Sequence, residues 1–173
     1  MTDSTNQGQE RSDFAAKLAK QRGFLRQTVQ GLSDEQAALT PTPSQLCLGG
    51  IVKHVSQVEQ RWAAFILNGP TEMGGGMDAG AMEAHAASFR MLPGETLSGL
   101  LAAYDEVAIR TEKVIQELDS LDVSQPLPAA PWFEPGARWS ARQVLLHILA
   151  ETAQHCGHAD IIREAIDGTK TMG

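Results

Sequence analysis

Glu151 and His155 stand four residues apart in the segment 139–168, which predicts one long helix. At about 100° per residue, their side chains lie roughly 40° apart around the helix axis and one turn from each other. Ile148 and Ile162 recur on the same face, so this face is expected to turn toward a protein core. A buried carboxylate is costly unless it is paired or bound to a metal, and this spacing allows a Glu and a His to hold one cation.

A third residue of this kind, His54, lies at the edge of the apolar stripe of another predicted helix. That helix runs from about residue 46 or 48 to residue 67. Gly49 and Gly50 near its start are each unfavourable in a helix by about 1 kcal/mol relative to Ala. We expect the two glycines to permit the close approach of another backbone or of a ligand.

The three polar residues together form a plausible metal-ligand set, because metal sites in helical bundles are built from facing helices. His54, Glu151 and His155 would supply two imidazoles and one carboxylate. Three protein ligands leave a fourth position for water or substrate, which is the pattern of catalytic rather than structural zinc sites. Nitrogen and oxygen donors fit zinc well, with nickel, iron and manganese as alternatives.

The same residues also have interpretations that require no metal. Glu151 is placed to pair with a buried arginine such as Arg61 or Arg142. His155 and His158 are compatible with a polar seam of hydrogen bonds inside a plain helical bundle. A carboxylate and two imidazoles on one core-facing line favour the metal site more than any one of them does alone.

The other two histidines have different expected environments. His147 lies near the edge of the apolar stripe, where we expect it to hydrogen-bond to backbone or to a carboxylate. His85 belongs to the irregular stretch 70–96 and is expected to face solvent. Within that stretch, residues 79–90 predict a short helix that would lie across one end of a bundle as a lid or pocket wall.

The remaining pattern predicts helices and no strand. Long helices are expected over four segments, residues 12–30, 46 or 48 to 67, 97–118 and 139–168. Ser33 and Gln36 have the spacing of a capping box that starts one short turn. The connection 119–138 is rich in proline, and its Trp132 and Phe133 are expected to fold back onto the helices. These features predict an all-α fold, a four-helix bundle, whose order of helix directions the pattern leaves open.

The length of 173 residues fits a single domain. We expect that domain to span residues 12–168, with flexible tails at 1–11 and 169–173. No apolar run is long enough to span a membrane, and the polar start lacks the apolar region of a secretion signal. A cytoplasmic location is therefore expected.

The charge and the cysteines narrow the possible partners. A net charge of −7 and a pI near 5.2, with no basic patch, argue against nucleic acid as a partner. Cys47 and Cys156 do not form a C-x-x-C pair, and in a cytoplasmic protein they are expected to be free thiols.

Two longer motifs surround the candidate ligands. The first is L-G-G-I-V-K-H-V-x-x-V-E, from Leu48 to Glu59, and the second is W-S-x-R-x-V-L-L-H-I-x-x-E-T-A-x-H-x-G-H-A-D-I-I-R-E-x-I-D-G, from Trp139 to Gly168. They resemble the DinB-like superfamily, and most of all its actinobacterial mini-circle protein branch. That branch is related to mycothiol-dependent maleylpyruvate isomerase and to the mycothiol and bacillithiol S-transferases. The resemblance extends from about Phe14 to Gly168 and implies a four-helix bundle in up-up-down-down order.

The resemblance also implies one divalent metal ion held by His54, Glu151 and His155. Many DinB-like proteins have His where Glu151 stands, and the version with Glu resembles the maleylpyruvate isomerase pattern. The family further implies a metal-bound water that a thiol displaces, after which the metal-bound thiolate attacks an electrophile. Elementary chemistry agrees, because a metal lowers the pKa of a thiol and the thiolate is the nucleophilic form.

Three further residues receive roles from the same resemblance. His158 would lie beside the ligands or face the substrate instead of binding the metal. Arg142 and Arg163 are candidates to bind a carboxylate or phosphate of an anionic thiol cosubstrate, although an Arg on a helix is more often solvated or salt-bridged.

The expected function is that of a metal-dependent transferase that joins a low-molecular-weight thiol such as mycothiol to electrophiles. One alternative is a thiol-dependent isomerase of the maleylpyruvate type, and another is a non-catalytic metal-binding bundle. The expected partners are a small-molecule thiol and an electrophile, with no nucleic acid and no membrane. The sequence leaves open whether the protein is an enzyme and whether it is a monomer or a homodimer.

Overall fold

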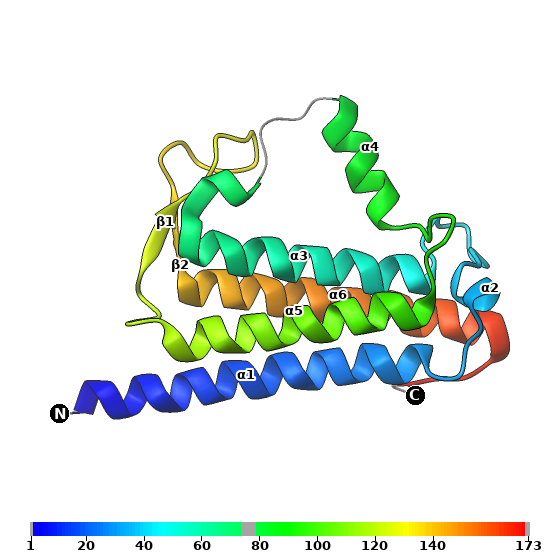
Figure 1. Ribbon diagram of the computed structural model, residues 1–173, viewed down its shortest axis with the longest axis horizontal. Helices are drawn as coiled ribbons and strands as arrows, with labels where there is room; N and C mark the ends of the chain where they lie inside the picture. Colours follow the sequence, from blue (N-terminus) through cyan, green and yellow to red (C-terminus); the bar gives the residue numbers. More distant parts are fainter. Residues whose placement is uncertain (1, 74–78, 172–173) are drawn as a thin grey trace.

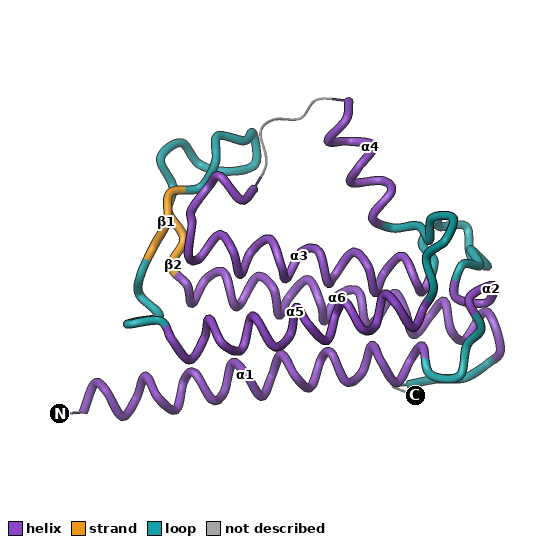
Figure 2. Tube along the Cα trace, in the orientation of Figure 1, coloured by secondary structure: helices purple, strands orange, loops and turns teal. Residues whose placement is uncertain are grey.

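The computed structural model describes residues 2–73 and 79–171 and confirms the all-α fold class. Four long helices lie side by side (Figure 1): α1 (Thr2–Val29), α3 (Leu48–Asn68), α5 (Leu97–Glu117) and α6 (Ala141–Asp167). The connections contain the shorter elements (Figure 2): α2 (Asp34–Ala37), the 3₁₀ helix η1 (Gly69–Met73), α4 (Ala79–Ser88), β1 (Ser124–Pro126) and β2 (Arg138–Ser140). No helix among the described residues is long and apolar enough to cross a membrane.

The long helices run up, down, down and up, which corrects the up-up-down-down order implied by the family resemblance. Arg142 at the start of α6 donates to Glu10 near the start of α1, and Arg163 near the end of α6 donates to the carbonyl of Gln30 just after α1. Helices α1 and α6 are therefore parallel, while α3 and α5 run in the opposite direction (Figure 1). The cause is the connection 69–96, which returns to the end of the bundle where α3 starts, so that α5 is parallel to α3.

The first helix starts earlier than its apolar pattern predicts. It was expected from about Ser12 and begins at Thr2, so residues 2–11 are helical where a flexible tail was expected. Two side chains of this first part bind neighbouring helices. Glu10 accepts hydrogen bonds from Arg142, and Arg11 donates to the carbonyl of Leu118 at 2.7 Å. The early start thus has a tertiary cause that hydrophobic periodicity does not report.

Capping residues set the limits of the other helices as their spacing predicts. Ser33 with Gln36 forms the expected capping box at α2, and Ser140 with Gln143 forms another at α6. Helix α6 ends at Gly168, whose φ of 77° is in the left-handed region that favours glycine. The helix that contains Glu151 and His155 is therefore defined at both ends by local chemistry.

The two short strands were not predicted. They pair antiparallel in the connection 118–140, with Gln125 opposite Trp139. Each strand is only three residues long, too short to show the alternation by which a strand is recognised in a sequence. Of the two aromatic residues expected to fold back in this connection, Phe133 packs against Trp139 with ring centroids 5.6 Å apart, whereas Trp132 is 63% exposed.

A buried ion pair joins α1 to α3 inside the bundle. Arg22 is 3% exposed and Glu59 is fully buried, and the guanidinium donates to both carboxylate oxygens, at 3.1 and 2.5 Å. The bidentate geometry offsets the cost of removing both charges from water. Loss of Arg22 would leave the buried Glu59 without its partner, whereas Arg22 also binds Glu112 at 3.1 Å.

The start of α3 packs directly against the chain that leaves α4. A Cβ atom on Gly50 would lie 1.9 Å from the backbone oxygen of Phe89, and one on Gly49 would lie 2.2 Å from Sδ of Met91. Gly50 therefore permits the close approach of another backbone, as its cost in a helix indicated, and Gly49 permits that of the Met91 side chain. This contact holds the end of α4 against α3.

We predict that Gly50→Ala lowers the free energy of unfolding by about 1–3 kcal/mol, because the new methyl group overlaps backbone that cannot rotate away. Gly49→Ala should cost less, since the thioether of Met91 can adopt another rotamer. The matched control is Gly23→Ala in α1, which has no neighbour within 4 Å and should gain up to about 1 kcal/mol from helix propensity. Urea unfolding of the metal-free proteins measures all three, and equal stability of the Gly50 and Gly23 variants would contradict this packing.

Candidate metal centre

The structure brings together the three residues expected to bind a metal. One ligand atom from each of His54, Glu151 and His155 lies within 4.8 Å of the other two. Nε2 of His155 and Oε2 of Glu151 are 3.9 Å apart. A tetrahedral zinc ion with ligand bonds of about 2.0–2.2 Å separates its ligand atoms by roughly 3.3–3.6 Å. Small side-chain rotations would therefore bring the three donors to bonding distance of one ion.

The packing of α3 against α6 creates this arrangement. His54 comes from the buried face of α3 and is 6% exposed, and His155 comes from the facing side of α6 and is 8% exposed. Glu151, one turn earlier on α6, is only partly buried. Two imidazoles thus lie inside the bundle, and the carboxylate is more exposed than either of them.

Ser88 determines which nitrogen of His54 is available. The Ser88 hydroxyl donates to the carbonyl of His85 at 2.6 Å, and its oxygen lies 3.0 Å from Nδ1 of His54. Because the hydroxyl proton is already used, Ser88 must accept at this contact and Nδ1 of His54 must carry the proton. The lone pair of His54 is then on Nε2, as binding to a cation requires.

Burial keeps the candidate imidazoles neutral. Burial in the bundle, helped by the nearby His155, His85 and Arg61, lowers the pKa of His54 to about 3. The pKa of His155 is also lowered, first by burial and then by His158, against the opposing effect of Glu151. Neutral imidazoles are the form that binds metal.

His158 lies beside His155, as the resemblance implied. The two Nδ1 atoms are 3.4 Å apart, a contact in which one ring donates and the other accepts. When His155 is the donor, its lone pair is on Nε2, the atom that faces Glu151. His158 is not part of the three-residue group itself.

Phe89 and Ser88 are site residues that sequence reasoning missed. The ring of Phe89 stacks on His54 with centroids 3.8 Å apart and an interplanar angle of 22°. Both residues lie at the end of α4, and only the close approach at Gly50 places them over His54. The glycines at the start of α3 were the one sequence signal that another segment packs there, and they did not identify residues 88 and 89 as that segment.

A cavity of about 630 Å³ opens beside the three residues and is lined by α3, η1, α4 and α6. His54 and Glu151 form part of its wall, and Val58, Trp62 and Met73 provide an apolar surface. Cavities of this size hold small-molecule ligands. Two of the three donors, His54 and Glu151, therefore border a space that is large enough for a substrate.

The two remaining histidines also line this cavity. His85 is exposed as expected, yet its ring lies 5.8 Å from that of His54. His147 packs against both Trp62 and Trp139, with ring centroids 4.8 and 5.3 Å away. Among the described residues His147 has no hydrogen-bond partner, in contrast to the expected bond to backbone or carboxylate.

The two candidate cosubstrate-binding arginines lie elsewhere and are engaged within the protein. Arg142 binds Glu10 and Asp122 beside the start of α6. Arg163 donates to Asp167 at 3.0 Å and to two carbonyl oxygens at the end of α1. Neither lines the cavity. The arginine that does line it is Arg61, which sequence reasoning considered only as a partner of Glu151.

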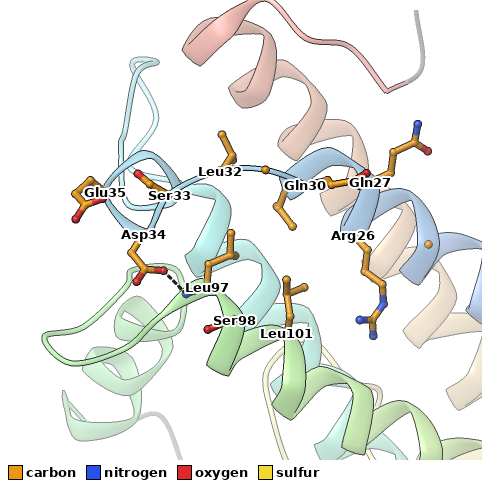
Figure 3. Close-up of a pocket in the computed structure, with 13 residues that line it drawn as sticks. Arg26, Gln27, Gln30, Leu32, Ser33, Asp34, Glu35, Leu97, Ser98 and Leu101 are labelled. Atoms are coloured by element: carbon orange, nitrogen blue, oxygen red, sulfur yellow. Dashed lines mark hydrogen bonds between the residues drawn. The ribbon is translucent and has the colours of Figure 1, made fainter.

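A separate surface depression of about 1010 Å³ lies between the end of α1, α2 and the start of α5. Figure 3 shows its lining, including Asp34, which accepts a hydrogen bond from the backbone of Leu97 at 2.7 Å. It shares no residue with the cavity beside His54, and the described residues that line it include no His or Cys. The chemistry of the chain is therefore concentrated between α3 and α6.

Comparison with known proteins supports the fold and the family. The crystal structure of a conserved protein from Enterococcus faecalis matches with a TM-score of 0.65 and 13% sequence identity, over 91% of this chain and 97% of that one. At this identity the match shows the fold alone. A search of curated proteins finds no match. A family model described as mycothiol S-transferase matches residues 13–168, which confirms the resemblance to the DinB-like superfamily. The chain belongs to the mycothiol S-transferase family.

Proposed function

We propose that this protein is a metal-dependent thiol S-transferase that joins mycothiol to electrophilic small molecules. The observation that carries this proposal is the grouping of His54, Glu151 and His155, two of which, His54 and Glu151, form part of the wall of a cavity of about 630 Å³. A mycothiol S-transferase needs a site that ionises a thiol next to a space for a second substrate. A divalent ion, with zinc as the proposed one, fits the donor set of two imidazoles and one carboxylate.

When bound, a zinc ion would supply Lewis acidity that favours the thiolate over the thiol near pH 7. The residues of the chain prepare the site for this. Ser88 fixes the tautomer of His54 by accepting a hydrogen bond from its Nδ1. Nδ1 of His158 contacts Nδ1 of His155. The apolar surface of Val58 and Trp62 offers a place for an electrophile and limits access of water to the thiolate.

A non-catalytic metal-binding bundle is the main alternative, and it requires a fourth protein ligand that closes the site. Among the described residues, the group of metal-ligating side chains has three members. His158 contacts His155 through Nδ1, on the far side of the ring from Glu151. This favours a fourth position that is open to the cavity. An isomerase acting on a diacid would need cations for two carboxylates, and Arg61 is the lone Lys or Arg among the described residues of the cavity wall.

The proposal is tested with zinc-loaded protein, mycothiol and a fluorogenic haloalkyl electrophile. We expect zinc-dependent conjugation that is lost on removal of the metal and restored when it is returned. Bacillithiol and glutathione, offered in parallel, identify the thiol that the protein prefers. Absence of a rate above the uncatalysed background with all three thiols would reject the transferase.

We predict one zinc ion per chain and a graded loss of zinc affinity in three variants. His54→Ala should abolish tight binding, since it removes a ligand. Ser88→Ala should weaken binding by about 10–100-fold, because Nδ1 of His54 loses the acceptor that fixes its tautomer. Ser98→Ala, at an exposed site on α5, is the matched control and should bind like the wild type.

Competition with a chromophoric chelator measures these affinities. Wild-type affinity in Ser88→Ala would show that the hydrogen bond does not prepare His54. A zinc-free wild type, with Glu151→Ala leaving stability unchanged, would instead support a plain bundle with a Glu–His seam.

We also predict that zinc binding at pH 6 displaces few protons. Two histidines of ordinary pKa, near 6.5, would together release about 1.5 protons at this pH. The pKa of His54 is lowered to about 3, so its ring is already deprotonated at pH 6, and the lowered pKa of His155 reduces what the second ring can release. Calorimetric titration in buffers of different ionisation enthalpy counts the protons, and a release close to 1.5 would contradict the burial of these imidazoles.

A further inference from the structure

A second, smaller hollow adjoins the cavity beside the candidate metal site. It has a volume of about 270 Å³ and is lined by Gln57, Gln60, Arg61 and Ala64 of α3 and by Glu72 of η1. Gln57, Arg61 and Glu72 line the larger cavity as well. We call this second hollow the polar groove. The shared residues make the two hollows neighbours, so that one ligand can occupy both.

The groove follows one row of side chains along α3. Gln57, Gln60, Arg61 and Ala64 have the i, i+3, i+4, i+7 spacing of a single helix face. This row continues from His54, one turn before Gln57, and extends along about 15 Å of helix axis. A ligand in the groove would therefore lead away from the candidate metal site toward solvent.

The side chains of the groove are available for hydrogen bonding. Within the described residues, Gln57, Gln60 and Arg61 form no hydrogen bond or ion pair with other side chains. Glu72 accepts one hydrogen bond, from Asn68 at 2.9 Å, and retains a second carboxylate oxygen. Ala64 contributes only a methyl group and leaves space between its neighbours.

The side chains that line the polar groove favour a neutral ligand with many hydroxyl groups. Each glutamine amide both donates and accepts, which matches a hydroxyl group that does the same. Arg61 and Glu72 carry opposite charges, so the groove as a whole is not a site for an anion. A carboxylate or phosphate near Arg61 would also face Glu72.

We propose that the polar groove binds the sugar portion of a sugar-linked thiol while its sulfur reaches the cavity beside His54. This inference rests on the proposed thiol transferase function and adds the location of the cosubstrate. It assigns the apolar surface of Val58, Trp62 and Met73 to the electrophile. The thiol cosubstrate would then lie in the polar groove and the electrophile against the apolar surface of the cavity.

The test measures binding of N-acetylglucosaminyl-inositol, a neutral analogue of the part of mycothiol that lacks the cysteine, by saturation-transfer NMR with metal-free and zinc-loaded protein. This probe carries no thiol, so the experiment depends neither on metal nor on catalysis. We expect binding to the wild type, loss of binding in Ala64→Gln, whose side chain fills the groove, and weaker binding in Gln60→Ala. Gln116→Ala on the exposed face of α5 is the matched control and should bind like the wild type.

A kinetic measurement complements the binding test. The ratio of kcat/KM for mycothiol to that for N-acetylcysteine should fall about tenfold in Gln60→Ala, as expected for one or two lost hydrogen bonds. Sugar binding without any transferase activity would support the assignment of the polar groove as a sugar site and reject the proposed transferase function. Transferase activity without sugar binding, or Ala64→Gln and Gln60→Ala variants that bind like Gln116→Ala, would overturn the groove assignment.

Discussion

Two buried imidazoles and a partly buried carboxylate lie where α3 packs against α6, and the rest of the site depends on how that polarity is accommodated. Burial keeps both rings neutral, so each must carry one proton and one lone pair. Ser88 and His158 contact the Nδ1 atoms of the two rings. The lone pair of His54 is thereby left on Nε2, and that of His155 is left on Nε2, facing Glu151, when His155 is the donor to His158. A bundle that only needed an apolar core would have no use for this arrangement.

The long connection after α3 is what makes this site possible. It makes α5 parallel to α3, which differs from the expected helix order, and brings the end of α4 against the start of α3. Gly50 allows the backbone of Phe89 to touch α3, and this contact places Ser88 and Phe89 on His54. The same connection supplies η1, whose Glu72 and Met73 complete the cavity wall. One crossover therefore supplies both the hydrogen bond that fixes His54 and part of the substrate space.

Local patterns predicted what local physics determines. The capping boxes and the limits of α6 follow from residues within one turn, and the alignment of Glu151 with His155 follows from helical periodicity. The link between His54 and α6 rested on the general rule that bundle metal sites are built from facing helices and on family resemblance, since no spacing within one helix reports which face of another helix it meets. Ser88, the order of the helices and the helical residues 2–11 depend on contacts distant in sequence, and these left no periodic signal. The sequence likewise did not predict that Arg61 lines the cavity, because this position depends on α3 and η1 together.

The central claim is that one ion binds between α3 and α6 with an open fourth position. Anomalous diffraction from crystals of the zinc-loaded protein, collected on either side of the zinc absorption edge, tests it most directly. The account predicts a single strong peak at bonding distance from Nε2 of His54, Nε2 of His155 and the carboxylate of Glu151, with a non-protein ligand on the side of the cavity. A peak between His155 and His158, or a fourth protein side chain in the coordination sphere, would contradict it.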